Sequence, residues 1–320
     1  MKYKGFAIRY TAALDTQRVS TQILPIDHLN ANNHEEHTMK LGNFDIHDQT
    51  FGIEIEYQRA DVSQQAIATA LNAAGVAAEV QGYNHRVQTC WKLVTDASCG
   101  YEIVSPILRG EDGFEQIRKV CEVLNRFNAV VNRSTGLHVH IGYEGATLKS
   151  FKNLLKTFAK YEEGIDMLMP PSRRASNNRY CMSLCDRSTY DSDEDTARKV
   201  NAYFDRVDAC RSLDDIRAMT ANRFVKLNTQ SYWRYGTIEV RHHSGTTDAA
   251  KIINWVRLSG ALVEMSKATR CVGRRTVKGY SPRVYLRRFF NKVIQGEVRC
   301  FYGQRYRDLV KVNGEPRGRA

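Results

Sequence analysis

The chain has 320 residues, 42% of them hydrophobic and 26% charged, which is typical of a globular protein large enough to bury a substantial core. Its apolar runs fall far short of the roughly 20 residues that span a bilayer, and residues 1–10 lack an apolar signal core, so we expect a cytoplasmic protein without membrane contact. Its eight cysteines form no CxxC pair, and we expect them to be reduced thiols. Lys and Arg outnumber Asp and Glu by 47 to 35, and the resulting net charge of +12 fits a nucleic-acid partner, an anionic substrate such as ATP, or a solvated basic surface.

The chain divides into three segments by pattern. Residues 1–48 are polar and lack periodic apolar positions, which predicts an N-terminal arm. Residues 49–268 carry the regular apolar spacing of a folded domain. Residues 269–320 are rich in Arg and Lys, and we interpret them as a basic C-terminal extension.

The predicted elements mix strands and helices. In chain order they are a strand at 50–58, a helix at 61–75 capped by Asp61 or Ser63 and ended by Gly75, two or three strands within 76–105, a helix at 113–128, a strand at 130–142, a helix at 147–168, short helices within 195–219, a hairpin of strands at 223–229 and 236–242, and a helix at 248–268. They do not alternate as a doubly wound sheet requires. We therefore predict an α+β fold with a mostly antiparallel sheet and helices on its outer face.

Four of the strand-like stretches carry charged residues at every second position. They are residues 51–57 (FGIEIEY), 101–105 (YEIVS), 136–142 (GLHVHIG) and 237–242 (TIEVRH). Residues two apart on a strand point to the same face. The pairs that share a face are Glu54 with Glu56, His138 with His140, and Glu239 with Arg241. Together these strands predict one sheet with a polar face that forms a metal site.

The charges on this face indicate which metal it binds. Glu54, Glu56, Glu102 and Glu239 repel one another when ionised, and divalent cations relieve that repulsion. Carboxylates with one or two imidazoles suit Mg²⁺ or Mn²⁺ better than structural zinc. Such ions commonly hold a nucleoside triphosphate, and the chain has neither a GxxxxGK[ST] loop nor a kinase signature.

Two arginines fit phosphate binding on the same face. Arg241 shares the face of Glu239, and Arg223 lies on the neighbouring predicted strand. The guanidinium fork matches phosphate and carboxylate oxygens. Each motif also has a simpler interpretation, since Glu-x-Glu is common on solvated strands and a same-face ion pair contributes little at a surface.

The motifs taken together resemble the amidoligase family. This family is a branch of the carboxylate–amine ligases related to glutamine synthetase and glutamate–cysteine ligase. The resemblance covers about residues 50–265 and rests on motifs in this order: 51–56 (FGIEIE), 91–98 (WKLVTDAS), 100–106 (GYEIVSP), 136–140 (GLHVH) and 236–246 (GTIEVRHHSGT). One departure is Val240, where the family usually has an aromatic residue; its side chain is expected on the opposite face, where it affects packing.

The resemblance implies an amidoligase-like catalytic domain over residues 49–268, built as a curved sheet that forms a funnel for ATP and metal. It implies an ATP-dependent ligase in which a substrate carboxylate attacks the γ-phosphate to give an acyl phosphate, and an amine then displaces phosphate to form an amide, with ADP also released. The identities of the acid and the amine are not readable from the sequence.

The resemblance also implies roles for individual residues. Glu54, His138 and Glu239 would hold one metal, Glu56 and Glu102 a second, and His140 would lie near the nucleotide phosphates. Arg241 would stabilise the transferring phosphoryl group, with Arg223 a weaker candidate, and Asp96 and Ser98 would face the substrate. Arg173, Arg174, Asn178, Arg179 and Tyr180 resemble a segment that closes over the site, and Arg179 is our candidate there for a nucleotide contact.

Two other functions use the same features. A metal-dependent hydrolase would use the same His and Glu residues to activate water. A non-catalytic protein on a ligase scaffold would bind nucleic acid through the cations that follow residue 266, although no recognised nucleic-acid-binding motif accompanies them.

Overall fold

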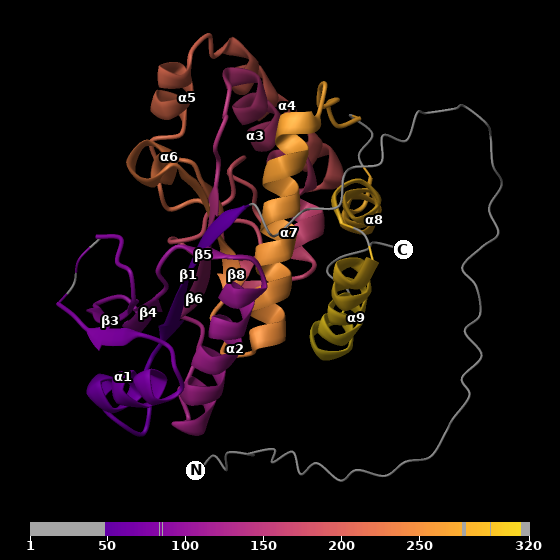
Figure 1. Cartoon of the computed structure of the whole chain (residues 1–320). Coiled ribbons are helices and arrows are strands. Elements are labelled where there is room, and N and C mark those ends of the chain that lie inside the picture. Colours follow the sequence, from indigo (N-terminus) through magenta and orange to yellow (C-terminus); the bar gives the residue numbers. More distant parts are fainter. Residues whose placement is uncertain (1–48, 83, 85, 277–279, 295, 315–320) are drawn as a thin grey trace. The chain divides into compact units, whose positions relative to one another are not determined.

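The computed structural model describes residues 49–82, 84, 86–276, 280–294 and 296–314, and the predicted arm at 1–48 lies outside them. The strands are β1 (Thr50–Tyr57), β2 (Ala78–Val80), β3 (Trp91–Asp96), β4 (Gly100–Val104), β5 (Leu108–Arg109), β6 (Gly136–Gly142), β7 (Leu227–Asn228) and β8 (Thr237–Ser244). The α-helices are α1 (Gln64–Ala73), α2 (Gly110–Arg126), α3 (Leu148–Asp166), α4 (Asp193–Ala209), α5 (Leu213–Met219), α6 (Gln230–Tyr235), α7 (Ala249–Ala268), α8 (Pro282–Val293) and α9 (Gly296–Asn313) (Figure 1).

The strands form one sheet in the order β2-β3-β4-β1-β6-β8-β7, with β5 paired to β1. Neighbouring strands are antiparallel except for β2 and β3, which are parallel. The predicted α+β fold with a mostly antiparallel sheet is therefore confirmed. β1 lies in the middle of the sheet, so its side chains have neighbours on β4 and on β6.

The two faces of the sheet differ as the alternation of β1 predicts. Ile53 and Ile55 point into the apolar core, where they are at most 1% exposed. The same core includes side chains of α2, α3 and α7, which lie beside the sheet in Figure 1. Glu54 and Glu56 consequently point to the other face, which the helices leave open.

Local signals in the sequence explain where several helices begin and end. The Ser63 side chain caps α1 by accepting a hydrogen bond from the Ala66 amide, and Gly75, with φ of +79°, ends it. Thr147 and Ser150 form a reciprocal cap at the start of α3. Asp248 accepts hydrogen bonds from two amides at the start of α7, as predicted.

Two regions differ from the prediction. The antiparallel partners β7 and β8 are connected by the short helix α6 rather than by a turn, and β7 is only two residues long, so Arg223 lies in the loop before it. The basic C-terminal segment forms α8 and α9, whose apolar residues Phe289 and Tyr302 are buried in the common core. The helices α3 and α8 approach closely at Gly164, where a Cβ atom would lie 2.6 Å from the Leu286 amide nitrogen.

A buried ionic network fixes the segment that follows α3. Asp166 and Glu162, both on α3, contact the Nζ of Lys226 at 2.5 and 3.0 Å. The guanidinium of Arg187 reaches the same two carboxylates, and Nε2 of His242 lies 2.7 Å from Asp166. Burial lowers the pKa of His242, so this histidine adds no charge at pH 7. Two carboxylates and two cations therefore balance one another inside the protein, which is the condition under which buried charges are tolerated.

Among the helices of the described residues, none is both long enough and apolar enough to cross a bilayer.

Candidate active site

The polar face of the sheet lines a cavity of about 1220 Å³. All but one of the residues predicted to bind metal or nucleotide or to act in catalysis line it: Glu54, Glu56, Asp96, Glu102, His138, His140, Arg223, Glu239 and Arg241. The exception is Arg179, whose guanidinium lies over the Tyr180 ring, 4.7 Å from its centroid, at the exposed edge of the cavity. The alternating charges of four separate stretches thus converge on one surface.

Strand register brings the predicted ligands together. Glu54 of β1 lies directly opposite His138 of β6, and the carboxylate lies 2.8 Å from Nδ1 of that histidine. Glu56 lies opposite Glu102 of β4, and its Oε2 accepts a hydrogen bond of 2.5 Å from the Gly136 amide. These pairs depend on which residues of neighbouring strands face each other, which alternation within a single strand does not determine.

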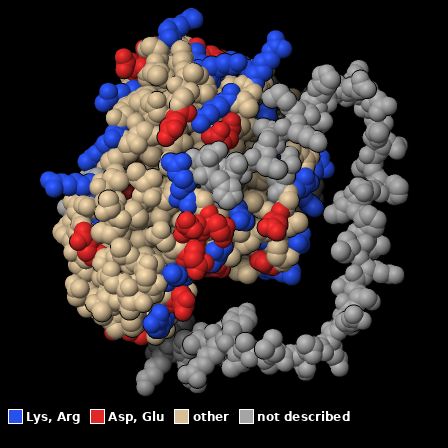
Figure 2. All heavy atoms as spheres, in the orientation of Figure 1, with Lys and Arg blue, Asp and Glu red and all other residues tan. Residues whose placement is uncertain are grey.

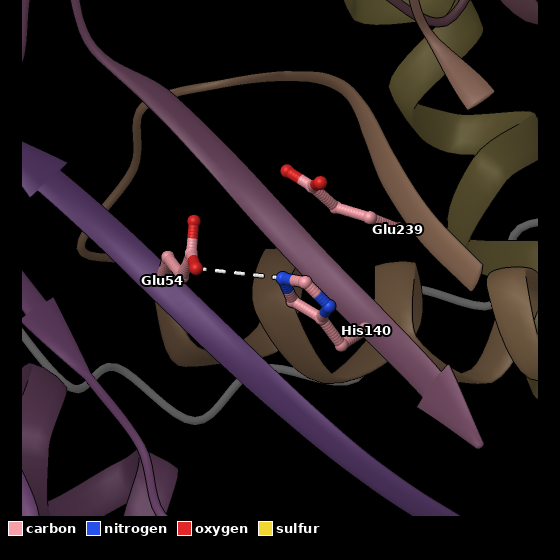
Figure 3. Close-up of side chains that lie close together, drawn as sticks. All are labelled: Glu54, His140 and Glu239. Carbon is pink, nitrogen blue, oxygen red and sulfur yellow. Dashed lines mark ion pairs between the residues drawn. The ribbon is translucent and has the colours of Figure 1, made fainter. Parts of the chain in front are cut away.

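Two groups of side chains can each hold a metal ion. Glu54, His140 and Glu239 form one group, and their donor atoms lie within 4.8 Å of one another (Figure 3). Glu54, Glu102 and His138 form the other with the same limit. Glu54 belongs to both groups, so this carboxylate is the centre of the site.

These groups differ from the sets that the resemblance implies. His140 lies 3.4 Å from Glu54 and directly opposite Glu239, which places it among candidate metal ligands rather than only near phosphates. His138 is close to three carboxylates, since its ring nitrogens lie 3.5 Å from Glu56 and 3.8 Å from Glu239. Each of the five residues predicted to bind metal thus lies in this cluster, and the division between two ions stays a prediction.

A register shift in β8 places His243 on the helix side of the sheet. Leu137 pairs with His243 and Val139 pairs with Val240, so two residues of β8 face the single residue His138 of β6. This is the arrangement of a β-bulge, which changes the direction of side chains next to it. Arg241 lines the cavity, whereas His243 packs on Trp255 of α7, with ring centroids 5.3 Å apart.

The carboxylates of the site do not titrate alike. Burial raises the pKa of Glu54, but hydrogen bonds with His138 and His140 outweigh burial and hold that pKa well below its usual value. Burial and then the charges of Glu54 and Glu56 raise the pKa of Glu102 well above its usual value. Ionising Glu102 beside the other carboxylates is therefore unfavourable, and a bound cation would relieve that repulsion.

Glu239 is held in place from two sides. Nδ2 of Asn228 donates a hydrogen bond of 2.6 Å to it, and the guanidinium of Arg241 forms an ion pair with it. Burial raises the pKa of Glu239, but the positive charge of Arg241 together with the charges of His140 and His138 outweighs burial and lowers the pKa. Nε of Arg241 also donates to the Tyr180 carbonyl at 3.3 Å. Arg241 thus connects the metal cluster to the segment after α3.

The remaining predicted residues lie at the edges of the cavity. Asp96, at the end of β3, accepts a hydrogen bond of 2.6 Å from the Ser98 amide. Burial raises the pKa of Asp96, but its hydrogen bonds with Ser98 outweigh burial and lower it, so this carboxylate is ionised at neutral pH. Arg223 is exposed, with its guanidinium 5.0 Å from the centroid of the Phe224 ring. Val240 is 1% exposed on the helix side, as expected.

Two residues that line the cavity, Lys92 and Asn228, were not predicted as site residues from the sequence. Lys92 is 5% exposed on the polar face, and its Nζ donates to the carbonyls of Asn84 at 2.9 Å and Arg86 at 3.0 Å. Lys92 could have been identified from the sequence, because it is a charged residue inside the apolar stretch 91–94 (WKLV). Asn228 has no comparable signal, because its role depends on pairing opposite Glu239.

The profile of one protein family matches the chain. Residues 47–263, about two thirds of the chain, match the family described as "Putative amidoligase enzyme". The chain belongs to this family. The match covers all four charged strands, so the amidoligase region contains every residue of the metal cluster.

Comparisons with other proteins add little to the family assignment. No curated protein matches this amidoligase chain. Among solved structures, it is similar to a bifunctional glutathione synthetase from Pasteurella multocida, with 11% identity and a TM-score of 0.38 over 87% of this chain and 46% of that one. It is also similar to a "novel glutamine synthase homolog", with 11% identity and a TM-score of 0.31 over 84% of this chain and 63% of that one. The chain therefore spans only about half to three fifths of the length of these proteins.

Proposed function

We propose that this protein is an ATP-dependent carboxylate–amine ligase that forms an amide through an acyl phosphate. The observation that carries the proposal is the position of Glu54, which belongs to two candidate metal groups on the floor of a 1220 Å³ cavity. Single small ligands usually occupy about 300–1,000 Å³. The cavity is thus large enough for a nucleotide and a second substrate.

The donor set fits Mg²⁺ or Mn²⁺. Its donors are the carboxylates Glu54, Glu56, Glu102 and Glu239 with the imidazoles His138 and His140, and no cysteine lines the described part of the cavity. Hard divalent cations prefer such oxygen-rich sites, whereas structural zinc prefers thiolate and imidazole. When bound, these ions neutralise phosphate charge and orient the phosphates.

The residues of the chain have separate tasks in the proposed reaction. In the first step the substrate carboxylate oxygen bonds to the γ-phosphorus and the bond to ADP breaks. Arg241, and to a lesser degree Arg223, would stabilise the oxygens of the transferred phosphoryl group. In the second step the amine nitrogen bonds to the acyl carbon and phosphate leaves, while Asp96, ionised at the edge of the cavity, would take the proton that the amine loses.

The test of the proposed function is the release of ADP. We expect Mg²⁺-dependent ADP formation that requires both a carboxylic acid and an amine, in a screen of amino acids and peptides followed by mass spectrometry of the product. The product should weigh the sum of the two substrates minus one water. If the protein instead cleaves amides or phosphoesters without ATP, it is a metal-dependent hydrolase.

The basic charge of the chain does not favour nucleic acid as the main ligand. On the face shown in Figure 2, Lys and Arg side chains are interspersed with Asp and Glu. Several exposed arginines form ion pairs, such as Arg274 with Asp205. Salt-sensitive DNA binding without any ATP hydrolysis would reverse this preference.

Replacing Arg241 with lysine should lower kcat for ADP release by roughly 100-fold or more, because removing one donor to a developing charge has about that effect. Lysine keeps the charge but lacks the fork that reaches both Glu239 and the Tyr180 carbonyl. Arg234, which also lines the cavity but lies on α6, supplies the matched control. Arg234→Lys should change kcat much less, and equal effects of the two substitutions would contradict the role of Arg241.

A further inference from the structure

Arg173 is a buried arginine that lines the cavity. It ends a short 3-10 helix, Pro171–Arg173, just after α3, and its side chain is 3% exposed. One of its terminal nitrogens donates a hydrogen bond to the Thr135 carbonyl. The residue is therefore fixed beside the site rather than placed on a surface segment that closes over it.

Within the described residues, Arg173 has no carboxylate within 4.0 Å, and its buried Nε has no hydrogen-bond partner. The two other arginines that are equally buried are neutralised, because Arg187 contacts Glu162 and Asp166, and Arg275 contacts Glu163 at 2.8 Å. A buried charge without a partner is costly. Among the described residues this guanidinium thus has no direct ion pair, although it lies beside the carboxylate of Glu56 at the wall of the cavity.

The Cys181 thiol, which interacts with Arg173, does not neutralise this charge. The pKa of the buried Cys181 thiol is raised by burial, although the positive charge of Arg173 acts in the opposite direction. The thiol is consequently neutral at pH 7. A negatively charged ligand in the cavity that Arg173 lines would supply the direct partner that the described residues do not provide.

Gly136 leaves open the space between Arg173 and the metal cluster. A Cβ atom at this position would lie 3.0 Å from Nε2 of His138, 3.2 Å from a terminal nitrogen of Arg173 and 3.4 Å from Oε2 of Glu56. The guanidinium, the imidazole and the carboxylate therefore lie close around one small volume, which is tight even for a single carbon atom. An anion that contacts the arginine would lie in the adjoining cavity, which Arg173, His138 and Glu56 all line, and so beside the candidate metal ligands.

We propose that Arg173 binds the transferred phosphoryl group, as a second guanidinium in addition to Arg241. This inference rests on the proposed ligase function. A phosphoryl group carries more negative charge than a carboxylate, and the bound cations that it needs are expected beside Glu56 and His138. A free substrate carboxylate gains less there, because the carboxylate of Glu56 lies beside the position.

The test compares nucleotide affinities by calorimetry in the full chain with Mg²⁺. Wild type should bind ATP more tightly than ADP, and R173Q should weaken ATP binding roughly tenfold or more while changing ADP binding less than about twofold, because only ATP carries the γ-phosphoryl group. R173K should lie between the two. R174Q is the matched control, since the adjacent Arg174 donates to the Met169 carbonyl and does not line the cavity.

A second binding experiment distinguishes recognition of the nucleotide's phosphoryl group from recognition of free phosphate. Orthophosphate added to wild type with Mg²⁺ and ADP should bind, and R173Q should weaken that binding as well if the position accepts the product phosphate. A loss confined to ATP assigns the contact to the nucleotide-borne group alone. Either result supports the contact.

Other outcomes overturn the inference. If R173Q lowers the thermal unfolding midpoint but keeps the ratio of ATP to ADP affinity, Arg173 is only structural. If R173Q does not fold, the ratio is measured in R173K instead. If wild type binds ATP and forms an amide while both variants keep the ratio, the inference fails and the ligase proposal stands. If wild type does not bind ATP, both fail.

Discussion

Glu54→Gln should reduce ADP release by more than about 100-fold, since even residues that only support metal ligands change metal affinity by roughly 10–100-fold. Glu54 belongs to both candidate metal groups, so its replacement removes a ligand from each. Glutamine keeps an oxygen that can accept the hydrogen bond of His138, so the fold should persist. Steady-state ADP release and Mn²⁺ binding by calorimetry measure the two effects.

The control for this prediction is Glu122→Gln, on the exposed side of α2 and outside the cavity. It should keep turnover and metal binding. A bound ion also stabilises the folded state according to its concentration and affinity, so Mg²⁺ should raise the unfolding midpoint of wild type but not of Glu54→Gln. Normal turnover in Glu54→Gln would refute the metal assignment.

Asp166→Asn should lower the free energy of unfolding by about 3–5 kcal/mol at pH 7, the usual result of removing one member of a buried ionic network. The substitution leaves Lys226 and Arg187 facing the single carboxylate of Glu162. It also weakens the contact that holds the Ala175 amide, which lies 2.9 Å from Asp166. Denaturant unfolding measures the loss.

The loss should depend on pH in a defined direction. Burial raises the pKa of Asp166, but the charges of Lys226 and Arg187 and the hydrogen bond with His242 outweigh it, so the folded pKa lies far below the ordinary value of about 3.9. The carboxylate therefore contributes its full stability above about pH 4, and the contribution decreases as the pH falls further toward the folded pKa. The difference between wild type and Asp166→Asn should shrink below about pH 4.

Asp208→Asn is the matched control for Asp166→Asn. Asp208 pairs with Lys156 at the surface, where its side chain is 47% exposed, and such pairs contribute about 1 kcal/mol or less. A similar loss of unfolding free energy in both variants would show that the buried network stabilises the fold no more than a surface ion pair does.

Alternation within strands was sufficient to predict the residues of the polar face. Glu54, Glu56, His138, His140 and Glu239 all line the cavity because each apolar neighbour on its strand is buried under helices. The fold class followed from the order of elements. Both inferences depend only on the spacing of residues within single segments and on the order of these segments, which can be seen directly in the sequence.

What the sequence did not reveal depends on distant parts of the chain meeting. The grouping of His140 with Glu54 and Glu239 comes from the register of three strands. Arg173, which the sequence placed only in a segment that closes over the site, lies in the cavity wall because the turn after α3 returns to the start of β6, where it meets Thr135. The helices α8 and α9 were missed because their many cations obscure the apolar residues, such as Phe289, that they bury.

The bulge in β8 makes the length of that strand as important as its composition. Two residues of β8, Arg241 and His242, face the single residue His138, so that His243 lies on the helix side beside His242, whereas Arg241 shares the cavity face of Glu239 by ordinary alternation. Deleting Arg241 or His242 would leave one residue opposite His138. Such a deletion would remove either the arginine from the cavity or the histidine that contacts Asp166 in the buried network.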